Sequence, residues 1–145
     1  MLVAAMLPMQ AAGQRAEKFN PFTMFFVLGR YPAGLSGFQC FGLNAEAKKA
    51  EKPPYSGYVL TDLGDPSNSA IEMKSIHLSG RNLRFATESR RGLVFTFEGR
   101  FLRDGDLTRF SRKKIPLVEG IARKFVNGKK RAQSRMRFYC MADAG

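Results

Sequence analysis

The chain has 145 residues, of which 44% are hydrophobic and 25% are charged, and its formal net charge is +12 at pH 7. This balance excludes a wholly disordered chain, and the length is sufficient for one domain with a core of its own. A charge this positive favours association with anionic partners but does not restrict the fold.

The positive charge is concentrated between Lys74 and Arg137. This stretch holds 18 of the 24 Lys and Arg residues but only five of the 12 acidic residues. Basic surfaces of this kind attract nucleic acid, lipid headgroups and anionic glycans. We therefore expect an anionic partner, and the charge alone leaves open which of these it is.

The first residues have the composition of a signal peptide. Met1–Gly13 is apolar and uncharged, and its small residues suit cleavage before Gln14, although a basic start is absent. We expect residues 1–20 to be a signal-like or disordered segment and residues 21–145 to be a single β domain. The leading expectation is a secreted or periplasmic protein, with the cytoplasm as the alternative. No later segment is apolar for long enough to predict a transmembrane helix.

Two cysteines, Cys40 and Cys140, lie a hundred residues apart. Metal sites usually use local Cys or His pairs, which this sequence lacks, so no metal ligand is predicted. In an exported protein the two thiols could form a disulfide. The alternative is two buried thiols that pack as small hydrophobic side chains.

Short apolar segments between turn residues predict strands in the first part of the chain. These strands are expected over residues 23–28, 35–44, 55–63 and 70–78. The polar segment 45–54 predicts an exposed loop. In the fourth strand the apolar face changes phase, from Ile71 and Met73 to Ile76 and Leu78, which predicts one bulged residue.

The later segments alternate more regularly. Strands are expected over residues 83–87, 95–101 and 132–140, and an edge strand or loop over 107–114. Asn127-Gly128 is the strongest short signal for a hairpin. In the last strand one face is apolar or small and the other is mostly basic: Ala132, Ser134, Met136, Phe138 and Cys140 against Arg131, Gln133, Arg135, Arg137 and Tyr139.

A helical alternative exists for residues 116–140. Leu117, Ile121 and Phe125 are spaced i, i+4, and Pro116 could open a helix that Asn127-Gly128 ends. Gly120 in the middle of the segment and the preceding strands favour the hairpin instead.

The sequence has a recurrent strand rhythm, Ile76-x-Leu78-x-Gly80-x-x-Leu83-x-Phe85, then Phe95-x-Phe97-x-Gly99-x-Phe101 and Asp104-Gly105-Asp106. This rhythm resembles that of small exported lipocalin-like or avidin-like β-barrels. The resemblance implies a closed antiparallel sheet and carries no site residue across. The predicted fold is therefore all-β, a single curled antiparallel sheet or a closed up-and-down barrel of about seven to nine strands.

Signals for catalysis are weak. His77 is the single histidine and has no patterned Ser, Cys or Asp partner. Glycine-rich phosphate-binding loops are absent, so no cofactor is predicted. A non-enzymatic protein is favoured, and an enzyme with an unpatterned site is the remaining possibility.

Basic and aromatic residues alternate in several strands, as in Arg84-Phe85, Arg100-Phe101 and Arg137-Phe138. This pattern is expected when the aromatic side chain enters the core and the basic one faces water. A denser basic set is the candidate polyanion site: Arg109, Arg112, Lys113, Lys114, Lys129, Lys130 and Arg131. The leading hypothesis is an exported binding or structural module with a basic surface, and the alternative is a nucleic-acid-binding protein that uses the surface of residues 74–137.

Overall fold

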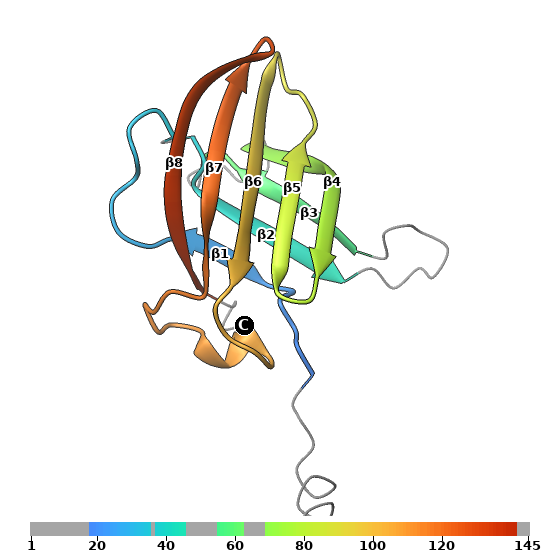
Figure 1. The fold of residues 1–145 in the computed structure, drawn as a ribbon, viewed down its shortest axis with the longest axis vertical. Coiled ribbons are helices and arrows are strands. Elements are labelled where there is room, and N and C mark those ends of the chain that lie inside the picture. Colours follow the sequence, from blue (N-terminus) through green and yellow to red (C-terminus); the bar gives the residue numbers. More distant parts are fainter. Residues whose placement is uncertain (1–17, 36, 46–54, 63–68, 142–145) are drawn as a thin grey trace, which may run out of the picture.

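Eight antiparallel strands form one closed barrel in the computed structural model, which describes residues 18–35, 37–45, 55–62 and 69–141 (Figure 1). The strands are β1 (Met24–Val27), β2 (Cys40–Ala45), β3 (Tyr55–Leu60), β4 (Ala70–Ser79), β5 (Asn82–Thr87), β6 (Leu93–Phe101), β7 (Val118–Val126) and β8 (Lys129–Cys140). Each strand pairs with the next one in sequence, and β8 closes the barrel against β1. The predicted all-β, up-and-down barrel is confirmed.

Two local predictions are also confirmed. The register between β4 and β5 shifts between Met73 and Ser75, where the change of phase predicted a bulge. Asn127 and Gly128 join β7 to β8 with φ angles of 49° and 83°, as a two-residue hairpin turn requires. The pairing of β7 with β8 excludes the helical alternative for this part of the chain.

Side chains alternate between the two faces of β8 as expected. Met136, Phe138 and Cys140 are buried, whereas Arg135 and Arg137 are exposed. The predicted roles of Arg84-Phe85, Arg100-Phe101 and Arg137-Phe138 are confirmed in the same way, because each phenylalanine is buried and each arginine is exposed.

Phenylalanine rings fill the interior. Eight of them are at most 2% exposed: Phe25, Phe38, Phe41, Phe85, Phe95, Phe97, Phe101 and Phe138. Neighbouring rings lie 5.0 to 6.5 Å apart in stacked, tilted and edge-on arrangements. Contacts of this kind add to the free energy gained by burying the rings.

The connection between β1 and β2 plugs one end of the barrel, and here one prediction was wrong. Residues 35–39 were expected to begin a strand, but β2 starts only at Cys40. Leu35 and Phe38 instead turn inward and are fully buried, with the Phe38 ring 5.4 Å from that of Phe95. Apolar residues beside glycines satisfy either arrangement, so the sequence pattern did not separate them.

The other end is closed by the connection between β6 and β7. The edge strand or loop expected over residues 107–114 is a loop that contains a single 3-10 turn, η2 (Leu107–Phe110). Asp106 caps this turn by accepting a hydrogen bond from the backbone N–H of Thr108 at 3.0 Å. Asn20 donates a hydrogen bond to the same carboxylate at 3.3 Å, and Phe19 packs edge-on against Phe101 at 5.2 Å.

Because of these contacts, Phe19 and Asn20 belong to the folded domain, slightly before the expected start at residue 21. The signal-like segment through residue 17 lies outside the described residues, as do residues 46–54 of the predicted loop. The described part of the chain contains no helix of the length and apolar character needed to cross a membrane.

Candidate functional site on the outer face

Side chains fill the interior of the barrel, so a ligand site is sought on its outer surface. Phe38 closes the barrel near Phe95, and the rings of Phe41, Phe97 and Phe138 occupy the space behind it. Polar groups that could recognise a ligand therefore lie on the outward faces of the strands and in the connections between them.

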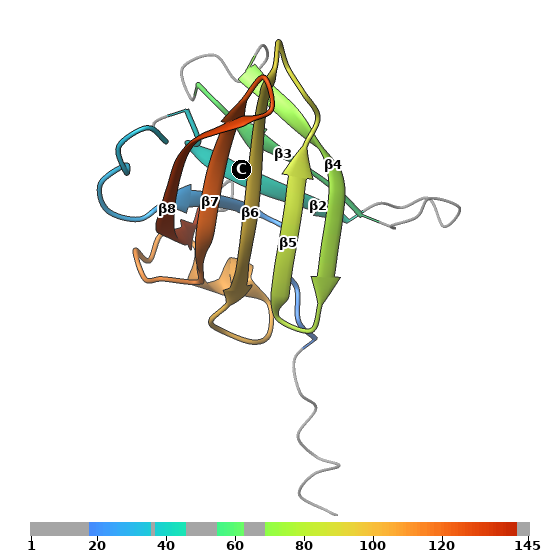
Figure 2. The same ribbon diagram turned by 45° about the horizontal axis from the view of Figure 1, so that its top comes forward.

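The basic set predicted from the sequence does not form one patch. Arg109, Arg112, Lys113 and Lys114 lie in the connection between β6 and β7, at the base of the barrel in Figure 2. Lys129, Lys130 and Arg131 lie at the β7–β8 hairpin, at the opposite end. The nine residues of β7 separate the two groups by about 30 Å, at roughly 3.4 Å per residue.

Contacts within each group also limit what these residues offer to a ligand. The guanidinium of Arg109 lies 4.8 Å from the centre of the Phe110 ring, and the ammonium of Lys114 lies 5.9 Å from that of Tyr139. Lys130 donates a hydrogen bond to Gln133 at 3.1 Å. These side chains rest on neighbours rather than converging on a common centre.

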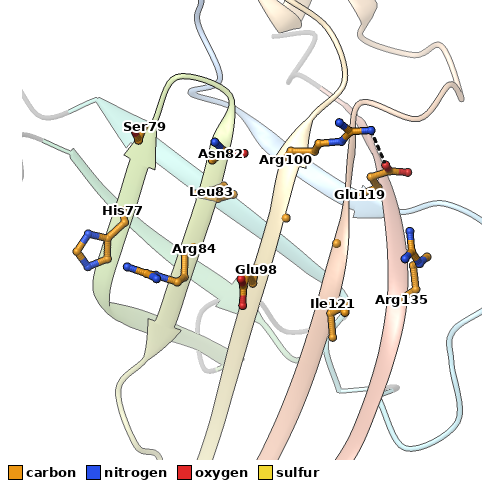
Figure 3. A pocket seen from close by; sticks show the side chains of 12 residues that line it. His77, Ser79, Asn82, Leu83, Arg84, Glu98, Arg100, Glu119, Ile121 and Arg135 are labelled. Carbon is orange, nitrogen blue, oxygen red and sulfur yellow. Dashed lines mark hydrogen bonds and ion pairs between the residues drawn. The ribbon is translucent and has the colours of Figure 1, made fainter.

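A groove on the outer face brings together side chains that are distant in sequence. It has a volume of about 540 Å³ and crosses β4 to β8 (Figure 3). Strand register explains this arrangement: Arg84 lies opposite Glu98, Glu98 opposite Ile121, and Ile121 opposite Arg135. The row begins at His77 on β4, which pairs with Arg84.

Three smaller hollows share residues with this groove, which we call the central groove. One shares Arg135, a second shares Asn82 and Arg100, and a third shares His77, Arg84 and Glu98. The cations that line the four hollows are all arginines, seven in number: Arg30, Arg81, Arg84, Arg100, Arg123, Arg135 and Arg137. We call these seven residues the arginine face.

The lining of the four hollows contains no lysine, and arginine and lysine bind anions in different ways. A guanidinium is planar, always charged and able to donate paired hydrogen bonds to a phosphate, sulfate or carboxylate. Lysine, by contrast, acts as a flexible point charge, and Lys113, Lys114, Lys129 and Lys130 lie toward the two ends. The lining of the four hollows therefore contains arginine and no lysine, whereas both kinds of residue occur at the two ends of the barrel.

Acidic residues neutralise part of the arginine face. Arg100 lies 3.4 Å from Glu119 and Arg123 lies 4.0 Å from Glu98, while Arg81 lies 3.5 Å from Asp104 outside the groove. These pairs are largely exposed and contribute little to stability, in the range of about 0–1 kcal/mol. They leave the face with an excess of positive charge, because seven arginines share the hollows with only two acidic residues, Glu98 and Glu119.

The cysteines do not form a disulfide in this structure. Both are buried thiols, and that of Cys140 donates a hydrogen bond to the Thr23 hydroxyl at 3.6 Å. On β1, Phe26 pairs with Cys40 of β2, whereas Phe25 pairs with Cys140 of β8, so one strand lies between the two thiols. Two strand spacings are about 10 Å, which is beyond the separation that a disulfide can bridge. Of the two alternatives from the sequence, the structure supports buried thiols.

Cys40 lies on the outward side of β2 beneath aromatic residues. Burial raises the pKa of its thiol to about 12. Desolvation also raises the pKa of the Tyr58 and Tyr31 hydroxyls, with a smaller contribution from Cys40. A thiol with a raised pKa stays protonated at neutral pH and is a poor nucleophile.

Within the described ranges, no three His, Cys, Asp or Glu side chains lie close enough together to hold a metal ion. His77 is exposed and lines the central groove beside Arg84. The arrangement can hold anionic groups, and it shows no nucleophile beside a base among the described residues that line the groove.

The sequence interpretation missed the arginine face as a unit. Arg84, Arg100 and Arg135 are exposed and Arg123 is half-buried, each on a different strand, and each taken alone indicates only a water-facing side chain. Strand register brings them together, and a single sequence does not contain that register. The one available signal was the alternation of arginine with buried phenylalanine.

Comparison with family models, with curated proteins and with solved structures gave no match. The likeness to lipocalin-like and avidin-like barrels therefore remains a resemblance of strand rhythm. The class that the structure itself defines is a small closed antiparallel β-barrel with an arginine-lined outer face.

Proposed function

We propose that this chain is an exported, non-enzymatic binding module that holds an anionic polymer on its arginine face. The observation that carries the proposal is the set of connected outer hollows whose cations are all arginines. The phenylalanine-filled interior supports it as well, because binding then has to use the outer surface.

The polymer is recognised through its charged groups. Three aromatic residues line the four hollows, Phe85, Phe97 and Phe101, and each is at most 2% exposed. Proteins that hold single-stranded nucleic acid usually stack bases on several exposed aromatic rings, and this lining offers no exposed Phe, Tyr or Trp ring. The geometry therefore favours a sulfated or phosphorylated glycan or a similar extracellular polymer over single-stranded nucleic acid.

Binding to a panel of polymers at about 0.15 M salt tests the proposal, because weak nonspecific attraction is largely screened under these conditions. The panel comprises heparin, polyphosphate, polyglutamate, duplex DNA and single-stranded RNA. We expect saturable binding to heparin or polyphosphate, with the affinity falling as salt rises because counterions are released.

Two matched sets of variants locate the site. The triple variant Arg84→Gln, Arg100→Gln, Arg135→Gln removes three charges from the arginine face. The triple variant Lys113→Gln, Lys114→Gln, Lys129→Gln removes the same number from the ends. We expect the arginine set to lose at least about tenfold in affinity and to lower the log–log salt slope by about two to three, and the lysine set to change little.

Equal losses in the two sets would show that net charge alone drives binding and would contradict the proposal. Tight binding to one nucleic acid that heparin does not displace would instead favour the nucleic-acid alternative.

A further inference from the structure

A notch lies at the seam between β1 and β8, and the proposed function does not say which chemical group binds there. β1 pairs with β8 through only three residues, Phe25 to Val27, and the longer β8 continues past the end of β1. The chain leaves β1 at Leu28, whose N–H donates to the Arg137 carbonyl at 2.8 Å. A hollow of about 180 Å³ remains between this departing segment and β8.

Three arginines line the notch, Arg30, Arg135 and Arg137, and no acidic residue lines it. None of the three has an ion pair within the described part of the chain. Arg81, Arg100 and Arg123 of the arginine face differ in this respect, since each lies beside a carboxylate. Glu119 lies opposite Arg137 on β7, but its carboxylate is paired with Arg100, so the positive charge at the notch keeps no ion-pair partner among the described residues.

The notch has supported walls. Arg135 and Arg137 are on a strand that is paired with β7 along its length, so their backbone positions are fixed. Arg30 lies in the β1–β2 connection, and this connection is anchored by the fully buried Leu35 and Phe38. Plugging the barrel thus also places the third arginine across from the other two.

We propose that the notch binds a single tetrahedral oxyanion, a phosphate or sulfate group carried by the polymer. This inference rests on the proposed function and names the group that it recognises. A hollow of about 180 Å³ suits one compact anionic group with some retained water. Three guanidinium forks match an acceptor with several oxygens better than a carboxylate, which has two.

Titration of the full chain with inorganic phosphate, sulfate and acetate, at constant ionic strength, tests this inference. The readout is the side-chain Nε–Hε signals of the arginines in a ¹⁵N-resolved NMR spectrum. We expect saturable movement of the Arg30, Arg135 and Arg137 signals with phosphate or sulfate, and only weak, unsaturated movement with acetate. The stronger of the two tetrahedral ions identifies whether the polymer is phosphorylated or sulfated.

Variants at the notch and matched controls complete the test. Arg30→Gln and Arg137→Gln should each weaken binding of the tetrahedral ion about tenfold, the loss expected for one hydrogen-bonded charge. Lys113→Gln and Lys129→Gln, which remove the same charge outside the arginine face, should change it less than about twofold. All four side chains are at the surface, and a thermal melt confirms that each variant is folded.

Equal weakening in the notch and control variants, or absence of saturation by both tetrahedral ions in the wild type, would overturn the inference. Polymer binding that depends on the arginine set but not on Arg30 or Arg137 would also overturn it, while leaving the proposed function intact. If phosphate saturates the notch and no polymer binds at physiological salt, the notch stands and the proposed function is wrong.

Discussion

Two glycines set the spacing of the central groove. Gly99 on β6 and Gly120 on β7 lie opposite each other, and the Phe97 ring covers them from the inside. A β-carbon at Gly120 would lie 2.5 Å from the Gly99 Cα and 2.7 Å from the Phe97 Cζ, and it would also meet the Glu98 carbonyl. The close approach of backbone at this point leaves no room for a side chain.

We expect Gly120→Ala to lower the free energy of unfolding by about 1–3 kcal/mol, the usual cost of overpacking. Urea denaturation measures this change. Gly37→Ala is the matched control, since its β-carbon would lie at an ordinary 3.5 Å from the Phe95 Cζ. A Gly120→Ala protein as stable as the Gly37→Ala protein would contradict the backbone packing described here.

The raised pKa of the Cys40 thiol predicts a pH dependence of stability. An unfolded thiol ionises near its ordinary value of 9.0, whereas the folded thiol ionises near about 12. Unfolding therefore releases a proton between these values, so the contribution of Cys40 to stability is complete below pH 9 and declines as the pH rises above it.

This effect can be isolated by comparing the wild type with Cys40→Ala in urea denaturation from neutral pH to above pH 10. We expect the wild type to lose free energy of unfolding relative to the variant once the pH exceeds 9. A difference between the two proteins that stays constant over this range would show that Cys40 is not shielded from solvent as the structure indicates.

At the level of elements, the strands could be predicted wherever burial imposes strict alternation. The Asn127-Gly128 turn and the change of phase in β4 predicted a hairpin and a bulge correctly, because each has a specific local cause. The segment 35–39 was assigned wrongly as strand. Its apolar residues are buried as expected, but they pack in the barrel end instead of pairing, and that choice depends on the shape of the whole barrel.

The plug itself gives a prediction. The Phe38 ring contacts five other buried rings, those of Phe41, Phe85, Phe95, Phe97 and Phe138. We expect Phe38→Ala to lower the free energy of unfolding by about 3–5 kcal/mol and to increase hydrogen exchange in the β1–β2 connection.

Tyr31→Ala serves as its control. Tyr31 lies in the same connection but is 43% exposed, so its replacement should change stability by no more than about 0.5 kcal/mol. If the two variants were equally stable, the connection would not plug the barrel.

For the whole molecule, summing charge along the sequence predicted a basic barrel but not the location of its site. The candidate residues were chosen because they are close in sequence, from Arg109 to Lys114 and from Lys129 to Arg131. Folding places these two groups at opposite ends and instead gathers arginines from four strands and two connections. Antiparallel register decides which charges become neighbours, so the site could not be read from local sequence.

The central claim is that an anionic polymer binds to the outside of a filled barrel. The most direct measurement is an NMR titration of the full chain with heparin or polyphosphate that follows two kinds of signal together. We predict that the Nε–Hε signals of Arg84, Arg100 and Arg135 move and saturate, while the ring signals of the interior Phe41 and Phe85 stay in place. Movement of the interior rings, or of lysines at the ends without the three arginines, would contradict the account.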